Sequence, residues 1–162
     1  MKQELPKRKA LRVKNYDYGN PGYYFITVCT ENRAKIFWDT VGATRGRPHL
    51  SALGHIVTEE IEGISAVYPD VRVDKYVVMP NHIHLILVIE GNNVLGGRPR
   101  VAPTVSRVIQ QTKGRISKRA GFSVWQKSFY DHMIRNETDY INICTYIENN
   151  PIKWEDDCYY KG

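Results

Sequence analysis

The sequence is poor in cysteine and has no long apolar run. Its three cysteines, Cys29, Cys144 and Cys158, form no CxxC pair, a pattern that suits free thiols in a reducing compartment. No apolar stretch approaches the length of about 20 residues that a membrane-spanning helix needs. The charged first residues also lack the apolar segment of a signal peptide. We therefore expect a cytoplasmic protein with no membrane partner.

Acidic residues are fewer than basic ones. The chain has 17 Asp and Glu against 23 Lys and Arg, a net charge of +6, which favours a polyanionic partner such as nucleic acid. Its 162 residues, 42% of them hydrophobic, suit a single globular domain, 1–162. Residues 1–22 are expected to form a basic arm, which is either a solvated tail or a contact to a nucleic-acid backbone.

The hydrophobic pattern predicts a mixture of strands and helices. β-Branched and aromatic runs predict strands over 23–30, 71–79 and 82–89, with a short extended piece at 122–126. Apolar residues at helical spacing predict helices over 51–68, 104–119 and 137–149. This order predicts an α+β, ferredoxin-like fold, in which helices pack on one face of an antiparallel sheet.

Two histidines open the strand that follows a Pro-Asn turn. His82 and His84 lie on one face, because side chains alternate along a strand, and the other face is uniformly aliphatic. Two imidazoles at the end of a strand form half of a metal site, although they could also be packed or exposed ring donors. A zinc site would need further Cys or His ligands at suitable spacing. A histidine-triad hydrolase would need a third histidine where Ile86 stands.

The last predicted helix presents a tyrosine and an amide together. Tyr146 and Asn150 are four residues apart, so they lie one turn apart at the flank of its apolar stripe. Both could reach the imidazoles, or Tyr146 could be a boundary aromatic and Asn150 a helix-ending residue. Tyr130 is a rival nucleophile, but Ile134 stands where its amide would be. His132 is expected to orient a neighbour or contact DNA.

Basic residues gather in the arm, in a Gly/Pro-rich loop and along the predicted helix 104–119. That helix carries no acidic residue, which favours phosphate contact over simple solvation. The candidate DNA-binding residues are Arg8, Lys9, Arg12, Lys14, Arg98, Arg100, Arg107, Lys113, Arg115, Lys118, His132 and Arg135.

The ordered set of motifs resembles a known family. It consists of the segments 79–84 (MPNHIH), 97–104 (GRPRVAPT), 125–136 (WQKSFYDHMIRN) and 146–151 (YIENNP). In this order they resemble the HUH single-strand DNA transposases of the insertion-sequence type, and in particular their REP-associated tyrosine transposase branch. The resemblance implies a ferredoxin-like fold, His82 and His84 as ligands of a divalent cation, Asn150 as the third ligand and Tyr146 as the nucleophile.

The expected function is metal-dependent nicking and rejoining of single-stranded, hairpin or repeat DNA through a 5′-phosphotyrosine. A covalent intermediate conserves the phosphodiester energy, and an imidazole and amide set suits Mg²⁺ or Mn²⁺, the latter tolerating nitrogen better. Two alternatives remain open: a non-catalytic hairpin-binding protein with this fold, and a metal-dependent phosphodiesterase that uses water as the nucleophile. We expect a monomer or homodimer associated with the nucleoid.

Overall fold

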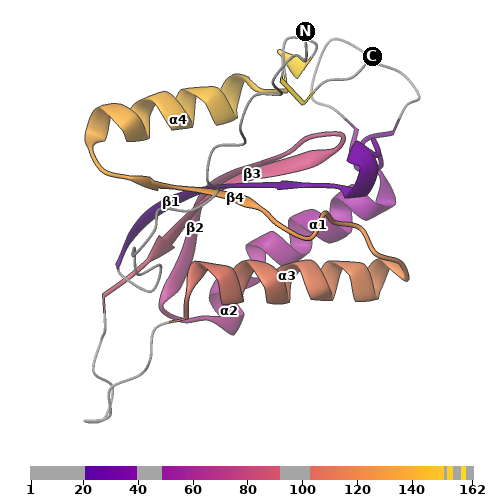
Figure 1. The fold of residues 1–162 in the computed structure, drawn as a ribbon, viewed down its shortest axis with the longest axis horizontal. Helices are drawn as coiled ribbons and strands as arrows, with labels where there is room; N and C mark the ends of the chain where they lie inside the picture. Colours follow the sequence, from indigo (N-terminus) through magenta and orange to yellow (C-terminus); the bar gives the residue numbers. More distant parts are fainter. Residues whose placement is uncertain (1–20, 40–48, 92–102, 152, 155–157, 160–162) are drawn as a thin grey trace, which may run out of the picture.

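The computed structural model describes residues 21–39, 49–91, 103–151, 153–154 and 158–159. Its centre is a four-stranded antiparallel sheet with the order β2-β3-β1-β4 (Figure 1). The strands are β1 (Gly22–Cys29), β2 (Val71–Val78), β3 (His82–Ile89) and β4 (Tyr130–Ile134). The sheet confirms the predicted α+β class and places the histidine strand between two neighbours.

Three of the helices begin at a polar side chain that caps them. They are η1 (Glu31–Arg33), α1 (Ala52–Glu62), α2 (Ile64–Val67), α3 (Val105–Ala120) and α4 (Glu137–Asn149). The side chains of Ser51, Thr104 and Asn136 accept hydrogen bonds from the backbone N–H groups three residues later, at the starts of α1, α3 and α4. These bonds satisfy N–H groups that have no partner within a helix.

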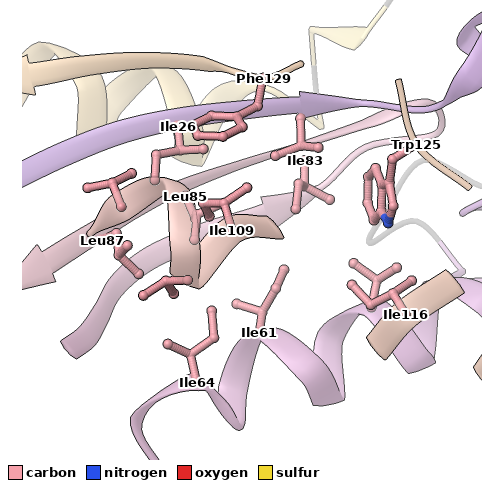
Figure 2. Packing of buried hydrophobic residues seen from close by; sticks show 14 of the residues in the cluster. Ile26, Ile61, Ile64, Ile83, Leu85, Leu87, Ile109, Ile116, Trp125 and Phe129 are labelled. Atoms are coloured by element: carbon pink, nitrogen blue, oxygen red, sulfur yellow. The ribbon is translucent and has the colours of Figure 1, made fainter. Parts of the chain in front are cut away.

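The larger hydrophobic cluster lies between the sheet and α1, α2 and α3. Figure 2 shows Ile83, Leu85 and Leu87 of β3 on the side of the sheet that meets these helices. These three belong to the aliphatic set that the sequence assigned to the core, and all are buried. The alternation of β3 therefore fixes which face carries the histidines: the opposite one.

That opposite face is covered by α4, as Figure 1 shows. A second hydrophobic cluster joins Ile86 and Val88 of β3 and Ile134 of β4 to Cys144 and Ile147 of α4. The prediction that the helices pack on one face was therefore wrong for α4. Both faces of β3 carry aliphatic residues that need cover, and helical periodicity gives no information about which face a helix will choose.

Two element boundaries also differ from the prediction. The fourth strand is Tyr130–Ile134, whereas the expected extended piece at 122–126 contributes only an isolated bridge between Trp125 and Thr30. The helix expected over 51–68 is interrupted at Gly63, which caps α1 and precedes α2. In the described part of the chain, no helix has the length and apolar character needed to cross a membrane.

Candidate active site

The two histidines meet at the end of β3 beside the turn from β2. Pairing of β1 with β3 sets Cys29 opposite His82 and Thr27 opposite His84. Both imidazoles are buried, and their Nε2 atoms lie 3.0 Å apart. The sequence prediction that both rings share one face and converge on one point is confirmed.

Each imidazole is held through Nδ1, the ring nitrogen that does not face the other histidine. His82 Nδ1 lies 2.7 Å from Asn81 Oδ1, and His84 Nδ1 lies 2.8 Å from Thr27 Oγ1. The Asn81 amide is oriented in turn, because its Nδ2 donates to the Tyr159 carbonyl oxygen at 3.0 Å. An amide oxygen only accepts, so His82 Nδ1 carries a proton and its Nε2 presents a lone pair. Such outer partners fix the tautomer and direction of metal-binding histidines.

His82 is neutral at physiological pH. Burial, with a smaller effect from the positive charge of Arg33, lowers its pKa from 6.5 to about 3. Desolvation disfavours the charged form of an imidazole. A neutral ring is the form that binds metal ions.

The donor set fits a divalent cation with octahedral geometry. Ligands about 2.1 Å from such an ion, at right angles, lie about 3 Å from each other, which matches the distance of 3.0 Å between the two Nε2 atoms. Asn150, the expected third ligand, is 3% exposed, and neither of its side-chain polar atoms has a hydrogen-bond partner among the described residues, which is compatible with a role as a metal ligand. No third His, Cys, Asp or Glu joins the pair in the described part of the chain.

Tyr146 projects from α4 onto the histidine pair. Its ring centroid lies 5.1 Å from that of His84 and 6.3 Å from that of Phe25. Trp154, eight residues later, lies 5.9 Å from the His82 ring. Asn150 occupies the position midway between them in the sequence, with helical backbone angles. Asn150, the residue that ends α4, therefore lies one turn after Tyr146 on the same side of that helix.

The other tyrosines considered are placed differently. Tyr130 lies on β4 opposite Thr27, with 43% of its surface exposed and no ring contact to either imidazole among the described residues. Tyr140 donates a hydrogen bond to Asp74 Oδ2 at 2.6 Å, and this bond is the main cause that raises its pKa. A raised pKa makes a phenol a poorer nucleophile, so the geometry favours Tyr146 over both.

Sequence reasoning missed four residues around the pair. Thr27 and Asn81 orient the rings, Tyr159 packs 4.5 Å from His82 between ring centroids, and the Arg33 guanidinium lies 5.5 Å from the Tyr159 ring centre. Asn81 could have been found as the neighbour of His82 in the turn. The others come from distant segments and required the strand pairing or the path of the C-terminal residues.

The predicted DNA-binding residues fall into three groups. Arg8, Lys9, Arg12, Lys14, Arg98 and Arg100 lie outside the described residues. Arg115 pairs with Glu60 of α1, and Lys113 donates to the carbonyl oxygens of Gln126 and Lys127. Arg107, Lys118 and Arg135 are exposed, and His132 pairs with Asp139 at 2.8 Å. The prediction that His132 orients a neighbour thus has a structural counterpart, at the first turn of α4.

The chain is similar to several known proteins. The chain is 36% identical over 170 residues to an uncharacterised protein of Haemophilus influenzae, an alignment that covers 94% of this chain and 93% of that protein. It is 31% identical over 84 residues to the REP-associated tyrosine transposase of Escherichia coli, covering 51% of this chain and 45% of the relative. A solved structure of a REP-associated tyrosine transposase bound to a REP hairpin has the same fold, with a TM-score of 0.65 at 22% identity, and the match covers 88% of this chain and 74% of that one.

The match to a protein family extends over most of the sequence. Residues 20–150 match the family described as IS200-like transposases. That range includes every strand of the sheet, both histidines, Tyr146 and Asn150. The comparisons confirm the resemblance to REP-associated tyrosine transposases, and the chain belongs to the IS200-like transposase family.

Proposed function

We propose that this transposase nicks and rejoins single-stranded DNA, presented in hairpins or repeats, through a covalent bond to Tyr146. The observation that carries the proposal is the contact of the Tyr146 ring with His84, one of two buried imidazoles whose Nε2 atoms lie 3.0 Å apart. A nucleophile beside a cation site is the arrangement that phosphoryl transfer requires. The contact lies within one chain, so Tyr146 is proposed to act on the histidine pair of its own protomer.

His82, His84 and Asn150 would hold the cation, Mg²⁺ or Mn²⁺. When bound, the ion would stabilise the negative charge that develops on the attacked phosphate. The protein's own part is to keep His82 neutral through burial and to aim both imidazoles through Asn81 and Thr27. The buried amide of Asn150 would gain the partner that it lacks among the described residues.

The proposed reaction conserves the number of phosphoester bonds. Tyr146 Oη forms a bond to phosphorus while the bond from phosphorus to the 3′ oxygen breaks, which leaves a 5′-phosphotyrosine and a free 3′-hydroxyl. The phenolic proton passes to water, which can reach Tyr146 because its side chain is 41% exposed, and the departing 3′ oxygen takes a proton from water. A 3′-hydroxyl attacking in reverse rejoins the strand without ATP.

Unpaired DNA is the proposed substrate. A duplex would have to be opened before one phosphate could approach a tyrosine on a packed helix, whereas a hairpin flank is already unpaired. The relative whose structure contains a REP hairpin supports this proposal. Net charge of +6 adds general attraction to phosphates, and such a substrate would bring the protein to the nucleoid.

The decisive experiment is incubation with DNA hairpins carrying single-stranded flanks in the presence of Mn²⁺. We expect a covalent protein–DNA band that is absent in Tyr146→Phe, because this change removes only the attacking oxygen. Tyr146→Phe should still bind the hairpin, and the control Tyr130→Phe should form the adduct. Digestion and mass spectrometry should locate the DNA remnant on Tyr146, and a remnant on Tyr130, Tyr140 or Tyr159 would overturn the assignment.

The non-catalytic alternative has one observation in its favour. Tyr159 and Trp154 pack on the histidine rings, and both imidazoles are buried. A protein that only binds hairpins would give no adduct with any metal ion, while one that uses water as the nucleophile would cleave DNA without an adduct. The same gel therefore separates all three functions.

A further inference from the structure

The turn that follows β1 has an unusual backbone. Asn32 and Arg33 both have φ of 54°, a left-handed conformation that few residues other than glycine adopt. Asparagine tolerates this conformation better than arginine does. Strained residues persist where the surrounding structure holds them, and they concentrate at functional sites.

The structure holds this turn from both sides. The Thr30 backbone N–H and Oγ1 both donate to the Asn81 carbonyl oxygen, at 2.9 and 3.0 Å. On the other side, the Glu31 N–H donates to the Val124 carbonyl oxygen at 2.9 Å. Because Asn81 directly precedes His82, these bonds fix the position of Arg33 relative to the histidine pair.

The Arg33 guanidinium lies near the histidine pair, over the ring of Tyr159. It lies 5.5 Å from the centre of the Tyr159 ring, and that ring lies 4.5 Å from His82. Arg33 is half-buried and has no ion pair with a carboxylate among the described residues. An arginine that lies over an aromatic ring can still donate its N–H groups to a phosphate.

We propose that Arg33 binds the phosphodiester that Tyr146 attacks, by donating hydrogen bonds to its non-bridging oxygens. The proposal rests on the function proposed above and adds a phosphate subsite to it. The Tyr146 ring contacts that of His84. The Tyr159 ring, near which the Arg33 guanidinium lies, is closer to His82 than to His84. A phosphate held at the histidine pair would therefore have the nucleophile near one imidazole and the guanidinium near the other.

The guanidinium suits this position for a chemical reason. Charge increases on the non-bridging oxygens as the tyrosine oxygen approaches, and a fixed donor pair stabilises that charge without reorganisation. The competing explanation is structural: Arg33 only pins Tyr159, and through it the C-terminal residues. The two explanations differ in whether the effect of Arg33 on DNA binding depends on the negative charge of the attacked phosphate.

The test measures hairpin binding in the Tyr146→Phe background, which prevents cleavage. The probe is selected from a pool of hairpins with randomised flanks as the one that gives the highest yield of adduct with the wild-type protein. Mapping the DNA remnant in this adduct identifies the attacked phosphate. Arg33→Ala should weaken binding of this hairpin about 10- to 100-fold. With an uncharged methylphosphonate at the attacked position, Arg33→Ala should cause no further loss, while a methylphosphonate elsewhere should leave the loss intact.

Three variants control the experiment. Lys127→Ala removes one exposed positive charge, and its small effect should not depend on which phosphate is neutralised. Arg33→Lys should retain part of the binding, which guards against a variant that fails to fold. Tyr159→Phe keeps the aromatic ring near Arg33 and should retain the Arg33 effect.

An equal Arg33→Ala loss with every methylphosphonate would overturn the proposal in favour of the pinning role. So would unchanged binding by Arg33→Ala. Failure of the wild-type protein to form any adduct would instead overturn the proposed function, so the two failures are distinct.

Discussion

A buried threonine hydroxyl sets the direction of one imidazole. Thr27 Oγ1 lies 2.8 Å from His84 Nδ1, so Thr27→Val should leave the packing nearly unchanged while freeing the ring to turn. Loss of such an outer partner typically lowers metal affinity about 10- to 100-fold. We expect that reduction for Mn²⁺, measured by calorimetric titration.

A second buried threonine provides the matched control. Thr112 Oγ1 donates to the Val108 carbonyl oxygen within α3. This helix packs in the larger hydrophobic cluster, on the face of the sheet opposite to the histidines. Thr112→Val should leave Mn²⁺ affinity unchanged. Equal affinities in wild type and Thr27→Val would show that the hydroxyl does not orient a metal ligand.

The neutral state of His82 makes the stability of the fold depend on pH. The pKa of His82 is about 3 in the folded protein and about 6.5 in an unfolded chain. Between these values the unfolded chain binds one more proton at this residue, so acidification favours unfolding by about 1.4 kcal/mol per pH unit. This contribution is fully present above pH 6.5 and is lost progressively as the pH falls towards 3.

The measurement is urea unfolding of wild type and His82→Gln, without metal, at several pH values from about 7 to 4. The variant lacks the titrating group, so its free energy of unfolding should fall less steeply with acidification. The difference between the two slopes should be about 1.4 kcal/mol per pH unit, the value for one proton. Parallel curves for the two proteins would mean that His82 is not held neutral by burial.

At the scale of elements, the site depends on the attachment of α4. Ile147 is 3% exposed and packs in the cluster with Ile86 and Val88, whereas Ile141 on the same helix is 54% exposed. Ile147→Ala should lower the free energy of unfolding by about 2–5 kcal/mol through the cavity that it creates. Ile141→Ala, the same chemical change, should alter it by less than about 0.5 kcal/mol.

Both variants are compared by denaturant unfolding and by adduct formation. Ile147→Ala should also reduce adduct yield, since Ile147 neighbours Tyr146 on the helix that carries it. A similar loss of stability in both variants would contradict the packing of α4 described here.

The strands with strong patterns were predictable, and β4 was not. β3 opens with alternating histidine and aliphatic residues and continues as an aliphatic run, so its extent and the face of its histidines followed from the sequence. β4 contains Asp131 and His132 within five residues, and it forms only because β1 has a free edge to pair with. A pairing of that kind depends on tertiary structure and leaves little trace in local composition.

The same distinction applies to the site. Strand periodicity placed His82 and His84 on one face, and helix periodicity placed Tyr146 at the flank of an apolar stripe. The family resemblance implied that they form one site, and the structure brings them together. Thr27 has no local feature that distinguishes it from any strand threonine, and its role appears only in the register that sets it opposite His84. Arg33 likewise gains its position from a turn anchored to a segment about fifty residues away in the chain.

At the scale of the whole molecule, positive charge is not equally available over the surface. Arg119 on α3 is paired with Glu59 and Glu60 of α1, while neighbouring Lys118 is exposed and has no ion pair among the described residues. Charges without a carboxylate partner should contribute more to phosphate contact. Lys118→Ala should therefore reduce the salt dependence of hairpin binding by about one unit of slope, and Arg119→Ala should change it less.

Fluorescence anisotropy of a labelled hairpin across a range of salt concentrations measures both slopes. Arg119→Ala instead removes a link between α1 and α3, so its effect should be on unfolding. Identical slopes for wild type and Lys118→Ala would place α3 away from the DNA.

The neutrality of the donors at the histidine pair has a consequence for how its ligands bind. Two imidazole nitrogens and an amide oxygen contribute no negative charge, so a divalent ion bound there would retain its full charge of +2. The natural counter-charge is then the phosphate of the DNA, and each ligand would raise the affinity of the protein for the other. By thermodynamic reciprocity the two factors are equal. Such a protein would bind its cation weakly when alone and tightly only when a DNA strand is bound. The DNA would then be needed for metal binding as much as the metal is needed for DNA binding.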